Sequence, residues 1–239
     1  MKAAILERVA SRSVTIGPRH SIVSFTFDDV PASALTNAVP VLDEHGVKAT
    51  FYVALGMSGG DGEFIGPDQV RMLAGRGHQI GCHTLSHYSL RAGTPAGLYE
   101  DALAGKRALE SLLAGTPTDH FAYPYGAVSV RAKALLQRAF TTMRTSTSGI
   151  NVGRVDLSYL RAENLYSRGS GLDLDRVRRR VQATVDGGGW LIFYTHGVRD
   201  DGDEYDTTRE DFRRAVEIVM EAGAPVLPVA QAMDSIRSA

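Results

Sequence analysis

Two neighbouring aspartates and a pair of histidines are the residues of this chain best suited to chemistry. Asp28 and Asp29 follow the apolar run 22–27, and His83 and His87 stand four positions apart. On a helical turn, residues i and i+4 share one face, so two imidazoles could bind one metal ion while a strand-end carboxylate supplies a third ligand. A fourth position is then open to water. Since adjacent carboxylates repel unless a cation or a proton divides their roles, the pattern predicts a metal-dependent hydrolase.

The two aspartates are expected to serve different functions. Successive residues of a strand point to opposite faces, and Pro31 marks a turn directly after them. One carboxylate can then bind a cation while the other accepts a proton from the water that the cation polarises. An alternative interpretation is that Asp28 or Asp29 only caps the helix expected from residue 32.

Two later segments could complete such a site. Residues 121–126 read Phe-Ala-Tyr-Pro-Tyr-Gly, a loop that could floor a sugar pocket and present the backbone N–H of Tyr125 to a developing oxyanion. An ordinary strand-to-helix turn with core tyrosines is the alternative. Residues 190–197 contain an apolar run that ends at His196. This side chain could donate a proton near neutral pH, or it could have only a structural role.

Composition limits the class of protein. The chain has 239 residues, 44% of them hydrophobic, which fits one α/β domain over 1–239 better than two small domains. The 26 basic and 27 acidic residues leave a net charge of −1 with no basic stripe, so no nucleic-acid partner is expected. The single cysteine, Cys82, excludes an internal disulfide and a cysteine-rich metal site.

No membrane span is expected either. No apolar run approaches the roughly 18 residues that a spanning helix needs. Charged residues interrupt the first eight positions, where a signal peptide would need an apolar core. The sequence therefore predicts a soluble, cytoplasmic protein, unless processing removed an export segment before residue 1.

Short β-rich runs alternate with amphipathic stretches of helical length, which implies parallel strands with helices packed outside. The expected strands are 22–27, 49–54, 79–83, 120–123, 140–145, 191–195 and 225–229. The expected helices are 32–45, 67–76, 95–113, 128–138, 172–185 and 208–222.

Seven or eight such units favour a closed or nearly closed barrel over an open sheet. Asp28, His83, Tyr123 and His196 all fall at or just beyond the ends of expected strands. Parallel barrels gather their catalytic groups at the carboxyl ends of their strands. We therefore expect the four segments to meet.

Taken together, these segments resemble the polysaccharide deacetylase family, carbohydrate esterase family 4, over roughly residues 21–229. The most specific parts are Thr-Phe-Asp-Asp at 26–29 and His-Thr-Leu-Ser-His at 83–87, in the family's order and approximate spacing. The resemblance implies a distorted (β/α) barrel of seven or eight parallel strands. It also implies removal of N-acetyl or O-acetyl groups from carbohydrates.

The resemblance assigns a role to each residue of the predicted site. Asp28 would be the general base and His196 the general acid. Asp29, His83 and His87 would be the ligands of a divalent metal, usually zinc.

The same resemblance extends to the walls of the pocket. The backbone N–H of Tyr125 would bind the oxyanion. Tyr194 stands where the family often has leucine in the pocket for the acetyl methyl group. Tyr123 and Arg144 are also expected to line the substrate pocket.

The chain departs from the family pattern at two points. Many members carry an arginine that orients the base where this chain has Ala122, and Arg144 or Arg161 are the alternatives for that role. The aspartate-rich stretch that supports the acidic histidine is not visible at 143–151, where Asp156 or Glu163 could substitute.

The acidic stretch at 200–206, just after His196, could shape the rim of the pocket. A solvated loop is the interpretation that the sequence favours.

Three functions remain open. The leading prediction is a metal-dependent hydrolase that releases acetate from an N-acetylated polysaccharide, oligosaccharide or sugar precursor. A hydrolase of a non-sugar amide, such as a formamide or a cyclic ureide, is the second. A catalytically silent carbohydrate-binding protein is the third, and the presence of every predicted catalytic side chain argues against it.

Overall fold

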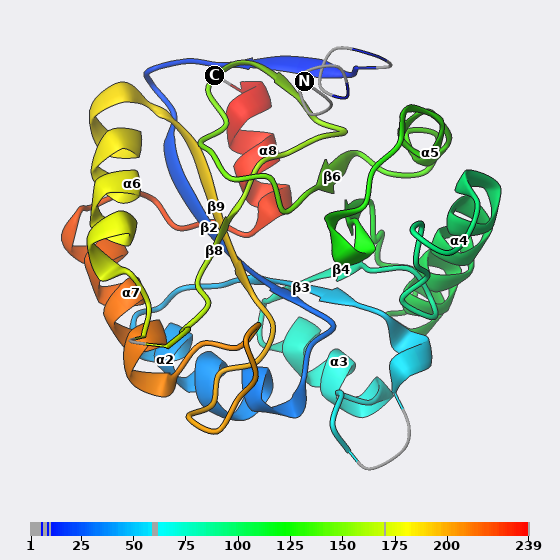
Figure 1. Cartoon of the computed structure of the whole chain (residues 1–239), viewed down its shortest axis with the longest axis horizontal. Helices are drawn as coiled ribbons and strands as arrows, with labels where there is room; N and C mark the ends of the chain where they lie inside the picture. Colours follow the sequence, from blue (N-terminus) through cyan, green and yellow to red (C-terminus); the bar gives the residue numbers. More distant parts are fainter. Residues whose placement is uncertain (1–5, 7–8, 10, 59–61, 170, 239) are drawn as a thin grey trace.

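A curled sheet of seven parallel strands forms the centre of the protein in the computed structural model, which describes residues 6, 9, 11–58, 62–169 and 171–238 (Figure 1). Its strand order is β6-β5-β4-β3-β2-β9-β8, and every pairing in it is parallel. The strands are β2 (Ser21–Asp28), β3 (Thr50–Val53), β4 (Gln79–Cys82), β5 (His120–Ala122), β6 (Thr142–Arg144), β8 (Glu163–Asn164) and β9 (Gly189–Thr195).

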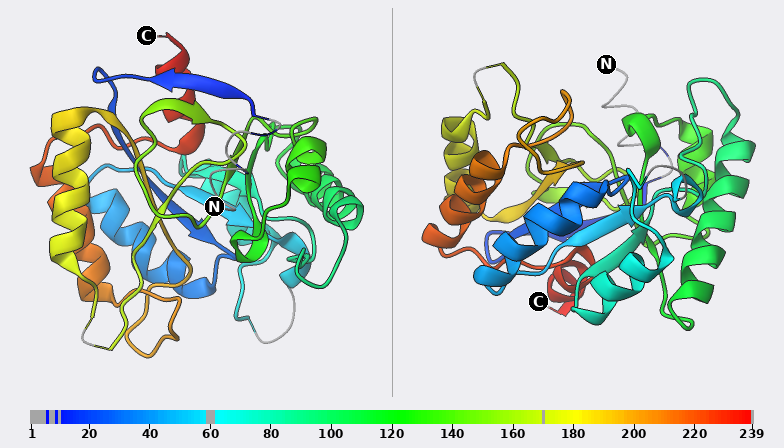
Figure 2. Two further views of the ribbon diagram at one scale, coloured as in Figure 1. Left: turned by 45° about the horizontal axis from the view of Figure 1, so that its top comes forward. Right: turned by 90° about the horizontal axis from the view of Figure 1, so that it is seen from below.

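Helices surround this sheet, as Figures 1 and 2 show for α2, α3, α4, α6 and α7. Parallel strands need crossover connections, and the helices supply them on the outside of the curl. The helical elements are η1 (Ala34–Ala38), α2 (Val39–Glu44), η2 (Leu55–Met57), α3 (Pro67–Gly75), α4 (Pro95–Leu112), η3 (Pro124–Gly126), α5 (Val130–Leu136), α6 (Leu174–Gly187), α7 (Arg209–Glu221) and α8 (Val229–Ser238). None of the helices described here has the length and apolar composition needed to cross a lipid bilayer.

An irregular segment completes the curl between the edge strands β6 and β8. The N–H of Leu160 donates to the carbonyl of Met143 at 2.9 Å, and the N–H of Thr145 donates to the carbonyl of Leu160 at 2.8 Å. The chain then runs directly into β8, which pairs with β9. This arrangement confirms the expected distorted (β/α) barrel.

The pleat of β2 explains why an aspartate reaches the interior of the barrel. Phe25 and Phe27 pack in the larger core cluster, whereas Ile22 belongs to the second cluster with Trp190. Because side chains alternate along a strand, Asp28 shares the face of Ile22 rather than that of the phenylalanines. Asp28 is therefore the last inward-facing residue of this strand.

Six of the seven expected strands are present, and the prediction of a strand at 225–229 is wrong. Only Val226 forms an isolated bridge, with Val23, before α8 begins at Val229. Two elements that the sequence did not predict, β1 (Ser13–Ile16) and β7 (Gly153–Asp156), form a separate antiparallel pair. The short strand β8 and the helix α8 were also missed, because short or mixed-polarity segments carry a weak periodic signal.

Candidate active site

One pocket of about 540 Å³ lies at the carboxyl ends of the parallel strands. The residues expected to act as base, acid, metal ligand, oxyanion donor or pocket wall all line it: Asp28, Asp29, His83, His87, Tyr123, Tyr125, Arg144, Tyr194 and His196. The tertiary structure thus brings together segments that are far apart in the sequence.

Asp29, His83 and His87 form a compact group of potential metal ligands, with one ligand atom from each lying within 4.8 Å of the others. The Nε2 atoms of His83 and His87 lie 3.5 and 3.3 Å from Oδ1 of Asp29. Two imidazoles and one carboxylate are a ligand set typical of zinc.

The protonation of this group suits a cation. Nδ1 of His83 lies 2.8 Å from the carbonyl oxygen of Ala122, which can only accept, so Nδ1 is the donor of this bond and the Nε2 atom is the one that faces Asp29. Burial lowers the pKa of His87 to about 4, so the His87 imidazole is neutral at pH 7. Oδ1 of Asp29 is buried and has no hydrogen-bond partner among the described residues. Since these ligand atoms converge, the three residues fit a divalent metal.

The histidine pair does not lie on a helical turn, so that part of the prediction is wrong. Thr84 and His87 have positive φ angles of 68° and 55° in an irregular loop after β4. The N–H groups of Leu85 and Ser86 both donate at 3.0 Å to Oδ2 of Asp101, a residue of α4. This carboxylate holds the loop in the conformation that aligns the two imidazoles.

The Asp28 carboxylate is paired with Arg144 in the floor of the pocket. Nη2 of Arg144 contacts both carboxylate oxygens, and both side chains are buried. The guanidinium carbon lies 4.8 Å from the ring centre of Tyr194 and 5.4 Å from that of Tyr52. Burial acts to raise the pKa of Asp28, but the attraction of Arg144 contributes to a net lowering, so the carboxylate is ionised at neutral pH.

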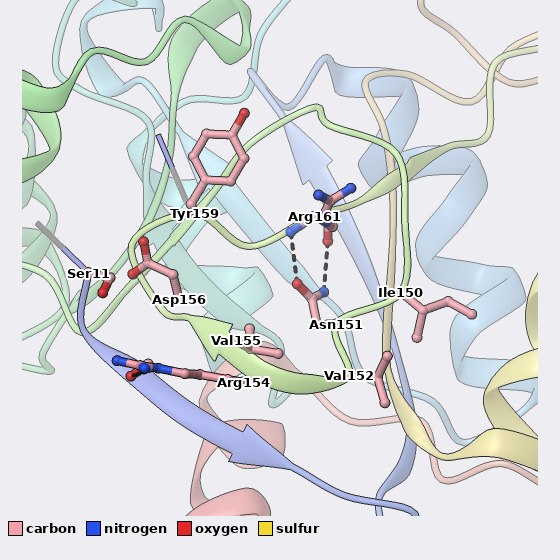
Figure 3. Close-up of a pocket in the computed structure, with 10 residues that line it drawn as sticks. Ser11, Ile150, Asn151, Val152, Arg154, Val155, Asp156, Tyr159 and Arg161 are labelled. Atoms are coloured by element: carbon pink, nitrogen blue, oxygen red, sulfur yellow. Dashed lines mark hydrogen bonds between the residues drawn. The ribbon is translucent and has the colours of Figure 1, made fainter. Parts of the chain in front are cut away.

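Of the two arginines considered for orienting the base, only Arg144 contacts it. Arg144 is the direct partner of Ala122 in the β5–β6 ladder, one strand away from the position where the family pattern has its arginine. Arg161 instead lines a second pocket, shown in Figure 3, where its backbone pairs with the side chain of Asn151.

His196 lies beside the ligand group. Its Nε2 is 3.8 Å from Oδ2 of Asp29, and its Nδ1 is 3.3 Å from the backbone carbonyl of Tyr205. The rings of Tyr166 and Tyr205 flank the imidazole at 5.8 and 5.7 Å. The His196 side chain therefore presents Nε2 toward the centre of the pocket.

The two acids expected to support His196 are elsewhere, so that prediction is wrong. Asp156 is ion-paired with the buried Lys133 and lines the second pocket (Figure 3). Glu163 pairs with Arg176 at 2.8 Å and with Arg180 at 3.0 Å. Buried charges need partners, and helix α6 supplies them to Glu163.

Tyr125 and Tyr123 have different environments. Tyr125, with a φ of 58°, is half exposed, and its ring centre lies 4.5 Å from that of His87. Arg91 donates to the Tyr125 carbonyl at 3.4 Å. The hydroxyl of the buried Tyr123 donates to the backbone carbonyl of Ser158 at 3.2 Å, so this tyrosine also fits the structural interpretation.

Several pocket residues lie outside the segments that the sequence singled out for chemistry. Asp203, Tyr205 and Asp206 line the pocket, and Asp206 is only 3% exposed, so the interpretation of 200–206 as a solvated loop is wrong at this residue. The others include Glu63, Phe64, Arg91, Tyr166, Arg168 and Arg199. Their positions depend on loop conformation, for which the sequence offers little periodic signal.

A group of potential metal ligands lies at the carboxyl ends of the strands in a distorted barrel. This arrangement makes the protein a candidate metallohydrolase. The chain belongs to the polysaccharide deacetylase family, whose model matches residues 16–143. It is 32% identical over 107 residues to a chitooligosaccharide deacetylase of Bradyrhizobium sp. (strain ANU 289), which covers 44% of this chain and 46% of that one. It is 33% identical over 127 residues to a chitooligosaccharide deacetylase of Sinorhizobium fredii (strain NBRC 101917 / NGR234), covering 53% and 55%. Each match thus spans about half of the relative's length.

The fold is similar to that of solved deacetylases. The chitin deacetylase of Colletotrichum lindemuthianum aligns with a TM-score of 0.67 at 17% identity, covering 94% of this chain and 92% of that one. The Bc1960 peptidoglycan N-acetylglucosamine deacetylase aligns with a TM-score of 0.63 at 20% identity, covering 92% and 91%. At these identities the likeness concerns the fold.

Proposed function

We propose that this protein is a metal-dependent deacetylase that hydrolyses the N-acetyl group of a carbohydrate to a free amine and acetate. The observation that carries the proposal is the meeting of three metal-ligand side chains with an ionised, arginine-paired aspartate and a histidine in one pocket. Family membership and the named activities of the matched relatives support the substrate class.

Asp29, His83 and His87 would hold the metal, and zinc suits their donor set best. When bound, a divalent metal supplies an acidified water and a positive charge beside the amide carbonyl. Oδ1 of Asp29 is buried and accepts no hydrogen bond from any residue that the structure describes, which supports this assignment, since an isolated buried carboxylate oxygen is costly without a cation.

Asp28 is the proposed general base. Its pairing with Arg144 keeps it ionised and limits its rotation, and both properties favour proton acceptance from the attacking water. Its neighbour Asp29 faces the two histidines instead, so the adjacent carboxylates take separate roles.

His196 is the proposed general acid, which donates a proton from Nε2 to the departing amine. The backbone N–H of Tyr125 is the proposed donor to the oxyanion. Tyr123, Tyr194 and Arg144 would form the walls around the acyl group. A cavity of about 540 Å³ lies within the range of small-molecule sites and suits sugar units.

Acetate release from chitin oligosaccharides tests the proposal, with nucleotide-linked and lipid-linked N-acetyl sugars and small amides assayed in parallel. We expect turnover that a chelator abolishes and added zinc restores, and that Asp28→Asn removes. Activity that survives both chelation and Asp28→Asn contradicts the proposal. Turnover of formamides or ureides alone favours a non-sugar amidase, and glycan binding without turnover under any metal favours a silent binding protein.

A further inference from the structure

We propose that Asp206 is a positioning residue that fixes the His196 ring by holding the backbone of the loop at 203–206. The inference rests on the proposed role of His196 as proton donor. It gives a function to residues 200–206, the acidic stretch after β9, for which the sequence favoured the interpretation of a solvated loop.

The partner of His196 is a backbone carbonyl. Both Nδ1 and the backbone N–H of His196 face the carbonyl oxygen of Tyr205, at 3.3 and 3.4 Å. The Thr195 hydroxyl donates to the same oxygen at 3.4 Å. In the part of the chain that the structure describes, no carboxylate lies within ion-pair distance of Nδ1. The orientation of the imidazole therefore depends on where this one carbonyl lies.

Asp206 joins the two ends of the loop that carries this carbonyl. Its Oδ1 accepts from the N–H of Gly197 at 2.7 Å, directly after His196 in the chain. Its Oδ2 accepts from Nε of Arg199 at 2.7 Å and from the N–H of Asp203 at 3.2 Å. Since Asp206 immediately follows Tyr205, these bonds fix both the histidine backbone and the carbonyl that its ring contacts.

The carboxylate is closely packed as well as hydrogen-bonded. A Cβ atom built on Gly197 would lie 2.6 Å from Oδ1 of Asp206, and one built on Gly202 would lie 2.6 Å from its Oδ2. Glycine at both positions allows the loop to approach the side chain at these distances. Asp206 is also almost fully buried, so little freedom remains for the loop while its charge pair with Arg199 is intact.

Removing this carboxylate would release the loop without touching the reacting groups. In Asp206→Ala, the Gly197 N–H and the Arg199 guanidinium lose their acceptors, and the Tyr205 carbonyl is free to turn away from Nδ1. The metal ligands and Asp28 have no contact with Asp206 among the described residues. The expected defect is therefore confined to proton donation by His196.

Two substrates with different leaving groups test this role. An N-acetyl sugar expels a poor amine leaving group and needs a proton donor, whereas p-nitrophenyl acetate expels a stabilised phenolate and does not. For Asp206→Ala we expect kcat on the amide to fall roughly 10-fold to 100-fold, with KM little changed and the ester rate near that of the wild type. Asp206→Asn, which keeps one acceptor, should give a smaller loss.

His196→Ala is the reference for a missing donor, and Asp201→Asn is the matched control in the same acidic stretch. Equal loss on both substrates in a folded Asp206→Ala protein, or no loss on either, overturns the positioning role. If His196→Ala itself spares the amide, the proposed acid role fails, which is a distinct result from failure of Asp206 alone.

A crystal structure of Asp206→Ala supplies a readout that is independent of activity. We expect the Tyr205 carbonyl to leave hydrogen-bonding distance of Nδ1 and the His196 ring to adopt another orientation. An unchanged contact between Nδ1 and this carbonyl overturns the proposal whatever the kinetic result.

Discussion

Arg144 illustrates what a single side chain contributes to this site. It pairs with Asp28 across 116 positions of sequence and lies close to the rings of Tyr52 and Tyr194. Removing one partner of a buried ion pair leaves the other charge uncompensated, which is far more costly than the net contribution of the pair itself. Stability and catalysis are therefore expected to depend together on this residue.

Arg144→Ala should reduce kcat by roughly 100-fold, within the range of a positioned general base, and lower the free energy of unfolding by roughly 3–5 kcal/mol. Steady-state kinetics and chemical denaturation measure the two effects. Placing the guanidinium on the neighbouring strand, in the double variant Ala122→Arg/Arg144→Ala, should restore part of the activity. Arg161→Ala, in the second pocket, is the control and should keep wild-type turnover. An Arg144→Ala variant with wild-type activity would count against the role of Arg144 in orienting Asp28.

The three proposed metal ligands, Asp29, His83 and His87, lead to a second prediction at the residue scale. The metal-free protein should bind one zinc ion and gain stability of about 2.7 kcal/mol at a free concentration 100 times the dissociation constant. Asp29→Asn and His87→Ala should each remove most of this gain, because each takes away a ligand. Metal analysis and thermal unfolding with and without chelator measure it, and wild-type zinc content in either variant would refute the assigned ligand set.

At the scale of elements, helix α4 shapes the proposed metal site from outside it. Asp101 accepts from the loop N–H groups, and Gly105, one turn later, lies against Thr84. A Cβ on Gly105 would lie 2.5 Å from the Thr84 carbonyl carbon, closer than real contacts allow. The helix and the loop can pack at this distance only because position 105 has no side chain.

Gly105→Ala should therefore weaken zinc binding although alanine favours helix by about 1 kcal/mol over glycine. The loop with His83 and His87 must shift to accommodate the methyl group. Titration of the metal-free protein with zinc measures the change. Gly75→Ala in α3, where a Cβ meets nothing within 4 Å, is the matched control. Unchanged zinc affinity in Gly105→Ala would show that the loop adapts without cost.

At the scale of the whole molecule, the parallel sheet explains why the predicted residues meet in one pocket. All its strands point the same way, so their carboxyl ends deliver side chains from β2, β4, β5, β6 and β9 to one rim. Near the other ends of its strands, the same sheet holds a buried histidine, His78, and a half-buried one, His120. His78 precedes β4 and His120 begins β5, and burial lowers the pKa of each to about 4.

These two histidines predict a loss of stability in acid. Each folded-state pKa, about 4, lies below the unfolded value near 6.5, so between these limits the unfolded chain binds more protons. Their stabilising contribution is complete above about pH 6.5 and is lost as the pH falls toward 4, by roughly 1–3 kcal/mol per histidine. Denaturation of the wild type and of His78→Gln/His120→Gln at several pH values measures the difference. Equal pH slopes for the two proteins would contradict it.

The sequence by itself determined which residues could form the site and roughly where they would stand. Asp28, His83 and His196 could be placed because apolar runs mark strands and parallel strands present their carboxyl ends together. The barrel followed from the same alternation of strands and helices. These properties are local, since they depend on residues a few positions apart.

Only the tertiary structure decided the partners of those residues. The choice of Arg144 over Arg161 for Asp28, and of the Tyr205 carbonyl over Asp156 or Glu163 for His196, depended on packing. The loop of the histidine pair likewise took its shape from a distant helix. Contacts between remote segments and positive φ angles leave no periodic trace in a single sequence, so they appear only when the chain is folded.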